Sequence, residues 1–112
     1  LGGFLRQVHE KQLNNVRVYC HDAVEVLKEA IPDESIDRCC IFFPDPWPKT
    51  RHHKRRLIQT PFVHELAKRL RSDGYIHCAT DWENYAEQML SVLSSEFLFI
   101  KISSKTLIAF CF

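Results

Sequence analysis

The sequence predicts an α/β domain with a mostly parallel, doubly wound sheet. Three observations lead to this fold class: short apolar runs alternate with amphipathic stretches, turn residues separate them, and one run is apolar almost throughout. The 112 residues are 46% hydrophobic and 12% aromatic, enough apolar material for one core. Alternation of this kind favours parallel strands joined by right-handed crossovers.

The first half of the chain predicts two strands around a helix. Residues 14–20 (NNVRVYC) form a β-favouring run, which we expect to be a strand ending at Asp22. Residues 23–31 (AVEVLKEAI) have apolar side chains at helical spacing, with Asp22 as N-cap and Pro32 as terminator. Residues 36–43 (IDRCCIFF) are nearly continuously apolar, which is typical of a central parallel strand buried on both faces.

The second half continues the alternation. Leu57 to Leu70 carries a helical apolar stripe, and Ser72-Asp73-Gly74 indicates a helix stop and turn. Residues 75–79 (YIHCA) predict a strand, and Asp81 precedes a helix from Trp82 to about Ser94. The expected order is therefore β, α, β, α, β, α.

The two ends are less regular. The stretch up to Leu13 has a partial apolar stripe, which predicts one more helix covering the first strand. The tail from Phe97 is apolar and strand-like, with a break at Ser103-Ser104. We therefore expect a domain over residues 1–96 and a divergent apolar tail over residues 97–112.

Charge and cysteine content exclude some classes of protein. Fifteen basic and 14 acidic residues give a net charge of +1, so total charge does not indicate a nucleic-acid partner. No signal peptide and no run of about 18 apolar residues is present, which argues against export and membrane spanning. An odd number of cysteines without a CxxC pair predicts reduced thiols in a cytoplasmic protein. These are Cys20, Cys39, Cys40, Cys78 and Cys111.

The most distinctive segment is FFPDPWPKTRHHKRRL, residues 42–57. Asp45 lies between two prolines, which restrict the backbone that carries its carboxylate. Trp47 offers a flat apolar surface on which a base can stack. Because open α/β sheets bind ligands beyond the carboxyl ends of their strands, the segment predicts a base-binding pocket. An equally weighted alternative is a rigid loop in which Asp45 caps the backbone and Trp47 packs on the core.

A basic run follows this loop. Five of the 15 basic residues fall within eight positions, and no acidic residue occurs from Pro46 to Val63. A solvated charge run is the ordinary interpretation, but beside a pocket the same charges would neutralise phosphates. Adjacent histidines rarely ligate one metal ion, so we expect no metal. The run comprises Lys49, Arg51, His52, His53, Lys54, Arg55 and Arg56.

Two more acids follow expected strands. Asp22 follows the first and Asp81 the third, so that both could line one sheet edge with Asp45. Each also precedes a helix, where aspartate is a favoured N-cap. Both interpretations stay open at this point.

This loop, preceded by CHDAVEVL and followed by ATDWENYAEQML, resembles the bacterial TrmB family of tRNA (guanine-N7-)-methyltransferases. The likeness extends from Leu1 to Ser95, about 85% of the chain. It implies part of a Rossmann-like fold that uses S-adenosylmethionine, with the first strands missing. The implied activity is that of a tRNA (guanine(46)-N7)-methyltransferase, with tRNA as partner.

Site roles follow from the same resemblance. It implies that Asp22 contacts the adenosine part of the cofactor and that Asp45 is the catalytic-site acid beside the methyl group. It also implies that Lys49 and Asp81 bind substrate, with Trp47 as the stacking surface. Arg51, His52, His53, Lys54, Arg55 and Arg56 would contact tRNA.

Two departures from the family lead us to expect an incomplete, weakly active or inactive fragment. The family's glycine-rich cofactor turn is not found, since Gly2 and Gly3 fit no GxGxG pattern. The family pattern is also lost near Phe97. One alternative is therefore a non-catalytic RNA-binding module that retains the basic loop. Another, ranked lower, is a methyltransferase for an exocyclic amino group, whose Asn/Asp-Pro-Pro-aromatic motif requires no basic run.

Overall fold

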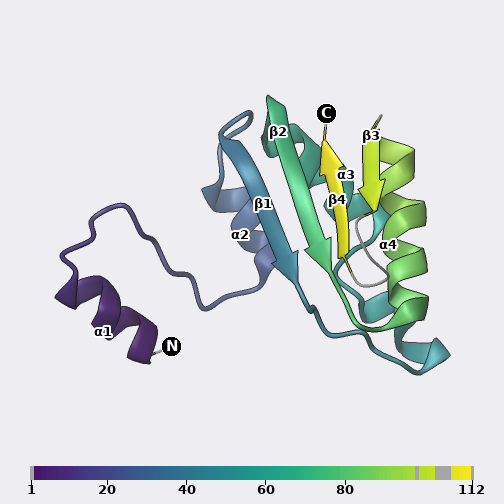
Figure 1. The fold of residues 1–112 in the computed structure, drawn as a ribbon, viewed down its shortest axis with the longest axis horizontal. Coiled ribbons are helices and arrows are strands. Elements are labelled where there is room, and N and C mark those ends of the chain that lie inside the picture. The colour runs from purple at the N-terminus through teal and green to yellow at the C-terminus, as the bar shows by residue number, and fades with distance from the viewer. Residues whose placement is uncertain (1, 98, 103–106, 112) are drawn as a thin grey trace.

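The computed structural model describes residues 2–97, 99–102 and 107–111 (Figure 1). Helices and strands alternate through the middle of the chain, and two strands follow the last helix. The elements are α1 (Gly2–Glu10), α2 (Ala23–Ala30), β1 (Ile36–Phe42), the 3-10 helix η1 (Thr50–Arg55), α3 (Thr60–Arg69), β2 (Leu70–Ala79), α4 (Glu83–Glu96), β3 (Phe99–Ile102) and β4 (Leu107–Cys111).

The described strands form one sheet in the order β1-β2-β4-β3. Strands β1 and β2 are parallel, whereas β4 is antiparallel to both β2 and β3. The predicted α/β class is confirmed, but the expectation of a mostly parallel sheet is wrong for these strands. Strand β1 was expected at the centre and lies at an edge, where Phe42 is 53% exposed.

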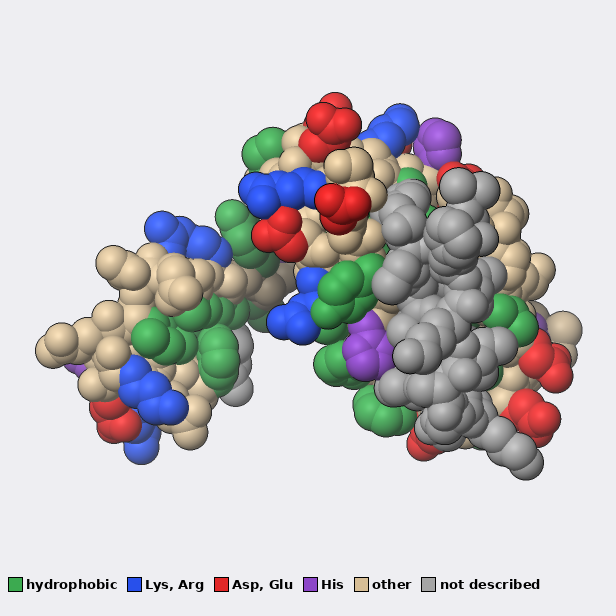
Figure 2. All heavy atoms as spheres, turned by 45° about the horizontal axis from the view of Figure 1, so that its top comes forward, with side chains coloured by type: hydrophobic (Ala, Val, Ile, Leu, Met, Phe, Trp, Pro, Cys, Tyr) green, Lys and Arg blue, Asp and Glu red, His purple; other side chains and the backbone are tan. Residues whose placement is uncertain are grey.

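Three helices cover one face of the sheet, with α3 packed between α2 and α4 (Figure 1). No described helix covers the other face, so the doubly wound arrangement is not observed in this part of the chain. On that face Arg38 donates a hydrogen bond to the Tyr75 hydroxyl (3.0 Å), and Phe42 meets His77 edge to face. Figure 2 shows hydrophobic, basic and histidine side chains gathered there.

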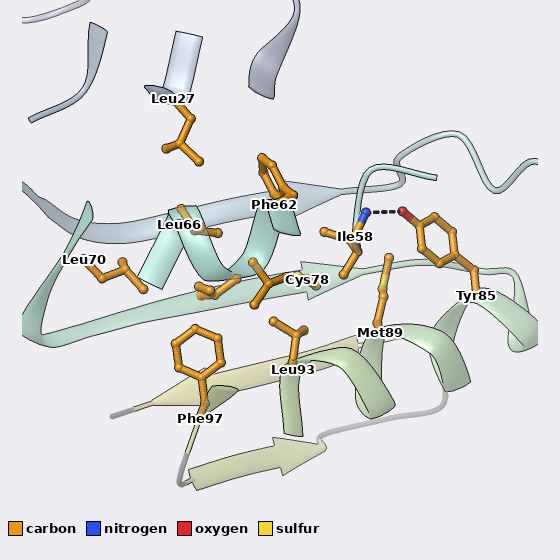
Figure 3. Packing of buried hydrophobic residues seen from close by; sticks show 12 residues of the cluster. Leu27, Ile58, Phe62, Leu66, Leu70, Cys78, Tyr85, Met89, Leu93 and Phe97 are labelled. Atoms are coloured by element: carbon orange, nitrogen blue, oxygen red, sulfur yellow. Dashed lines mark hydrogen bonds between the residues drawn. The ribbon is translucent and has the colours of Figure 1, made fainter. Parts of the chain in front are cut away.

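The core lies between the sheet and these helices (Figure 3). Alternation along β2 sends Ile76 and Cys78 towards the helices, as expected for a sheet with one covered face. The hydroxyl of Tyr85 accepts a hydrogen bond from the backbone N–H of Ile58 (3.0 Å), which satisfies both polar groups inside the core. Among the residues whose burial is described, the largest fully buried side chains are Tyr85, Ile58, Leu66, Ile76, Met89, Leu93, Val63, Thr80 and Cys78.

The N-terminal part departs from the prediction. Residues 14–20 form no strand, and Val18 is 40% exposed. A strand requires a neighbour to receive its backbone hydrogen bonds, and none of the described strands pairs with this segment. Helix α1 forms as predicted, but it buries no residue and covers no strand (Figure 1).

The predicted turn at residues 72–74 is part of β2. Ile36 pairs with Leu70 and Arg38 pairs with Tyr75, so extra residues of β2 bulge between these two pairs. A Cβ atom on Gly74 would lie 3.0 Å from the carbonyl oxygens of Arg71 and Ile36, so a larger residue would require the backbone to shift. The tail forms β3 and β4, as its strand-like pattern predicts. The expected break at residues 103–104 lies outside the described residues.

Candidate functional site at the carboxyl edge of the sheet

The candidate site begins where the two parallel strands end. Phe42 is in register with Ala79, and the N–H of Phe43 donates to the Ala79 carbonyl oxygen (2.8 Å). The segments carrying Asp45 and Asp81 therefore leave the sheet from adjacent strand ends, and both aspartates are exposed. This is the edge at which α/β sheets bind ligands.

The proline loop after β1 has an unusual backbone. Phe43 has φ of 50° and Trp47 has φ of 43°, so both lie in the left-handed region that favours glycine. Such residues cost about 1–3 kcal/mol each and cluster at functional sites. Within the loop, Oδ1 of Asp45 accepts a hydrogen bond from the N–H of Trp47 (3.0 Å). Asp45 thus shapes its own loop, and its exposed carboxylate retains lone pairs for a ligand.

The sequence left open whether Trp47 is a stacking surface for a base or packs on the core, and its position combines features of both. It is half-buried, and it packs against the basic segment. The His52 ring meets it edge to face with centroids 5.9 Å apart, and the Arg55 guanidinium lies 5.1 Å from its ring centroid. A cation over the ring face is an attractive contact. It links Trp47 directly to the basic run.

The basic run forms the 3-10 helix η1, which begins after Lys49. The His52 N–H donates to the Lys49 carbonyl oxygen (2.8 Å), which closes the first turn. Among the described residues, no carboxylate pairs with the basic side chains at the exposed positions of this segment. Their charges are available to an anionic partner. The exposed basic residues are Lys49, Arg51, Lys54 and Arg55, and His52 and His53 are half-buried.

Arg56 is placed differently from the rest of the run. It is 3% exposed, its Nε donates to the Pro46 carbonyl oxygen (2.6 Å), and its Nη1 donates to Oε1 of Gln88 (2.7 Å). Its guanidinium lies 4.8 Å from the ring centroid of Tyr85, and burial lowers the pKa of Arg56. The expected tRNA contact at this position does not fit, because the guanidinium is turned inward and committed to the protein.

Asp22 lies at a hollow that Arg55 and Arg56 also line. Its Oδ1 accepts hydrogen bonds from the N–H groups of Val24 (2.8 Å) and Glu25 (3.4 Å), which confirms it as the N-cap of α2. No strand precedes it, so Asp22 does not occupy a strand end as expected. The hollow is about 390 Å³, within the range of small-molecule sites. It is lined by Asp22, Ala23, Val24, Arg55, Arg56, Leu57, Gln59, Pro61 and Phe62.

Asp81 does not cap α4, contrary to one of its two interpretations. The N-cap position is Trp82, whose N–H bonds to the Thr80 hydroxyl oxygen (3.2 Å). Thr80 is buried and Asp81 is exposed. The carboxylate of Asp81 is therefore left available at the sheet edge.

Two residues at the site were not singled out from the sequence. Tyr85 and Gln88 lie three positions apart on α4 and hold Arg56 against the proline loop. In the sequence, the only sign of this role was a glutamine on the apolar side of a helix.

Among the residues described, no group of three histidine, cysteine or acidic side chains could hold a metal ion. In the same part of the chain, every helix is too short or too polar to cross a membrane.

Comparison with known proteins gives consistent matches. A family model described as putative methyltransferase matches residues 2–109. A protein of Nitrosospira multiformis named tRNA (guanine-N(7)-)-methyltransferase is 62% identical over 96 residues, 86% of this chain and 42% of that relative. Proteins of the same name from Burkholderia thailandensis and Legionella pneumophila (strain Lens) are each 59% identical over 96 residues. The chain spans 36–43% of the length of these relatives. The resemblance inferred from the loop motif is confirmed.

Proposed function

The chain belongs to the putative methyltransferase family, and we propose that the protein transfers a methyl group from S-adenosylmethionine to N7 of guanine in tRNA. The observation that carries this proposal is the proline loop, which presents Asp45 and Trp47 at the sheet edge beside basic side chains that pair with no described carboxylate. The names of the relatives support the same substrate. The parallel β1–β2 pair, with helices packed on it, supports a Rossmann-like core.

The chemistry requires positioning more than proton transfer. Guanine N7 has a free lone pair, so it attacks the sulfonium methyl without losing a proton. The N7–methyl bond forms as the sulfur–methyl bond breaks, and the positive charge passes from sulfur to the purine ring. A carboxylate at Asp45 would orient the base and stabilise this charge, and Trp47 would stack on the ring. Asp81, from the neighbouring strand end, would bind the same substrate.

S-Adenosylmethionine would supply the activated methyl group, and the described residues fit one part of it. The hollow beside Asp22 has the volume for an adenosine moiety, and Oδ2 of Asp22 accepts no hydrogen bond from the described residues. A ribose hydroxyl or adenine amino group could donate to that oxygen. No glycine lines the hollow, so the described residues supply no glycine turn for the rest of the cofactor.

The basic segment would bind the tRNA backbone. Lys49, Arg51, Lys54 and Arg55 are exposed and carry no carboxylate partner among the described residues. Each phosphate that such a side chain neutralises releases a counterion, so affinity should fall steeply with salt. His52 and His53, half-buried in η1, would shape this surface.

The test measures transfer of labelled methyl to unmodified tRNA, with N7-methylguanine located by chemical cleavage. Because the chain spans 42% of the Nitrosospira relative, it is assayed alone and as a chimera in which it replaces the matching segment of that relative. We expect N7 label with the chimera and a loss of about 100-fold or more in Asp45→Asn. Asp37→Asn, an exposed aspartate of β1 paired with Arg71, is the control and should retain activity.

The other outcomes separate the alternatives. Label on an exocyclic amino group would replace the proposal with the other methyltransferase class. Salt-sensitive tRNA binding without transfer by the chimera would favour the RNA-binding module, which the exposed basic segment also supports. Asp45→Asn with unchanged transfer would remove Asp45 from the site.

A further inference from the structure

Arg56 joins the proline loop to helix α4 through a network of hydrogen bonds and one ring contact. Its Nε donates to the carbonyl oxygen of Pro46 (2.6 Å), and its Nη1 donates to Oε1 of Gln88 (2.7 Å). Nε2 of Gln88 in turn donates to the Ile58 carbonyl oxygen (2.9 Å), and the Tyr85 hydroxyl accepts from the Ile58 N–H (3.0 Å). The Tyr85 ring lies under the guanidinium. Tyr85 and Gln88 of α4 therefore both contact Arg56, and each also forms a hydrogen bond with the backbone of Ile58.

This arrangement is a weak source of stability. Arg56 is 3% exposed, and no carboxylate among the described residues neutralises it. Its Nη2 is buried without a hydrogen-bond partner in the same part of the structure. Burying an unpaired N–H and an unneutralised charge is unfavourable, and a well-packed apolar side chain of similar size is often as stable. The contacts of Arg56 therefore matter most for the geometry they impose.

That geometry falls at the centre of the candidate site. Pro46 lies between Asp45 and Trp47, and its carbonyl oxygen is the loop atom that Arg56 holds. The two left-handed residues of this loop, Phe43 and Trp47, lie within three positions of it. A strained loop persists only where its surroundings determine it. Arg56 is the described side chain that fastens this loop to the core.

We propose that Arg56 is a positioning residue, which holds the Pro46 carbonyl against α4 and so presents Asp45 and Trp47 to the base. The inference rests on the proposed function for the reaction that the loop serves. This role distinguishes Arg56 from its sequence neighbour Arg55. Arg55 is exposed, its guanidinium lies over Trp47, and it belongs to the surface that would bind phosphates. Two adjacent arginines therefore have different tasks.

The experiment compares Arg56→Met, Arg56→Lys and Arg55→Met in the chimera described above. A Trp82→Phe background leaves Trp47 as the tryptophan of this chain, and any tryptophan in the flanking segments is likewise replaced. Acrylamide quenching of Trp47 then reports the loop without requiring activity. Methyl transfer gives kcat and KM, and tRNA affinity is measured across a salt series.

For Arg56→Met we expect quenching of Trp47 to rise about twofold and kcat to fall about 10- to 100-fold, because small displacements at a reacting centre have effects of this size. Its tRNA affinity and salt slope should stay within about twofold of the parent. Arg56→Lys should restore part of kcat, since an ammonium can still donate to the Pro46 carbonyl but cannot form the guanidinium fork. Arg55→Met should instead weaken tRNA binding and reduce the salt slope by about one.

Three results would overturn the proposal: unchanged Trp47 quenching in Arg56→Met, an unchanged kcat in an active chimera, or a loss of tRNA affinity and salt slope equal to that of Arg55→Met. If Arg56→Met does not fold, Gln88→Met removes one Arg56 contact and should raise quenching in the same direction by less. If the parent chimera transfers no methyl, the proposed function fails, and the quenching and salt series still decide whether Arg56 positions the loop.

Discussion

The first 22 residues and residues 23–97 form two contrasting regions. Both contain apolar residues at helical spacing, and both form helices. Helix α1 nevertheless buries no residue, whereas the core described for the chain lies within the second region. Figure 1 shows α1 standing apart from the sheet, joined by an extended segment. An amphipathic pattern specifies the element, but a complementary surface is needed for the element to pack.

Thiol labelling should show the largest difference between the two regions. Burial, with smaller contributions from Cys39 and Cys40, raises the pKa of Cys78 to about 12. Because the thiolate is the reactive form, only about one Cys78 in ten thousand ionises at pH 8. Cys20 is exposed in the first region. We expect iodoacetamide to modify Cys20 at least about a thousandfold faster, as measured by peptide mass spectrometry over time.

Labelling of Cys78 should also rise with pH, since its thiolate fraction increases up to about pH 12. Cys39 is an internal control, because burial raises its pKa to about 11 and its side chain is half-buried. It should react more slowly than Cys20 and faster than Cys78. Equal rates for Cys20 and Cys78 would contradict the packed core.

Truncation of one leucine in each region tests the same contrast through stability. Leu66 is 1% exposed in the core, and Leu5 is 46% exposed on α1. Leu66→Ala should lower the free energy of unfolding by about 2–5 kcal/mol, because it removes buried contacts and leaves a cavity. Leu5→Ala should change it by less than about 0.5 kcal/mol. Urea unfolding followed by circular dichroism measures both, and a comparable loss in Leu5→Ala would show that α1 packs.

The sequence predicted where helices and strands form better than it predicted which of them lie next to one another. The apolar stripes of α3 and α4 and the Asp22 cap of α2 were recognisable, because helices are specified by local spacing and capping. The run at residues 14–20 has strand propensity but forms no strand, because pairing depends on a partner elsewhere in the chain. For the same reason an apolar run could not reveal that β1 lies at an edge.

The site shows the same limit. The loop motif and its basic run were evident from residue types and spacing, and the structure brings Trp47, His52 and Arg55 together. From the sequence, the same role, contact with tRNA, was predicted for Arg55 and Arg56. The inward turn of Arg56 depends on Tyr85 and Gln88, about 30 positions away, and long-range contacts of this kind leave no local pattern.

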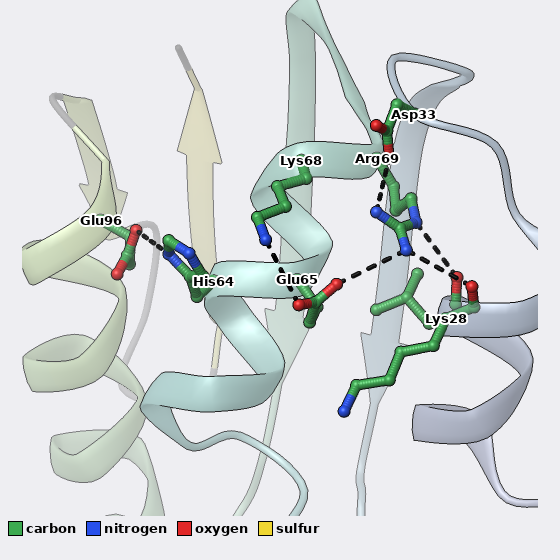
Figure 4. A network of polar contacts seen from close by, with 8 residues as sticks. Lys28, Asp33, His64, Glu65, Lys68, Arg69 and Glu96 are labelled. Carbon is green, nitrogen blue, oxygen red and sulfur yellow. Dashed lines mark hydrogen bonds and ion pairs between the residues drawn. The ribbon is translucent and has the colours of Figure 1, made fainter.

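Within the second region, Arg69 ties α3 to the end of α2 (Figure 4). Its Nη1 pairs with Asp33 (2.6 Å), and its Nε donates to the Leu27 carbonyl oxygen (3.2 Å). Arg69→Met should cost about 1.5–3 kcal/mol of unfolding free energy, because charge-assisted hydrogen bonds are lost at a buried position. The exposed pair of Arg71 and Asp37 is the control, and Arg71→Met should cost less than about 1 kcal/mol. Equal costs in urea unfolding would mean that burial of Arg69 adds nothing.

The smallest effect is expected at Asp22, the last residue of the first region and the N-cap of α2. From the sequence, Asp22 and Asp81 had the same two interpretations, but of the two only Asp22 accepts hydrogen bonds from a helix N-terminus. Asp22→Ala should therefore lower the free energy of unfolding by about 1 kcal/mol, and Asp81→Ala by less than about 0.5 kcal/mol. Asp22→Asn should recover most of the loss, because its amide oxygen also caps. Urea unfolding of the three variants measures the difference. Equal losses in both alanine variants would mean that the hydrogen bonds of the Asp22 cap add nothing to the stability of α2.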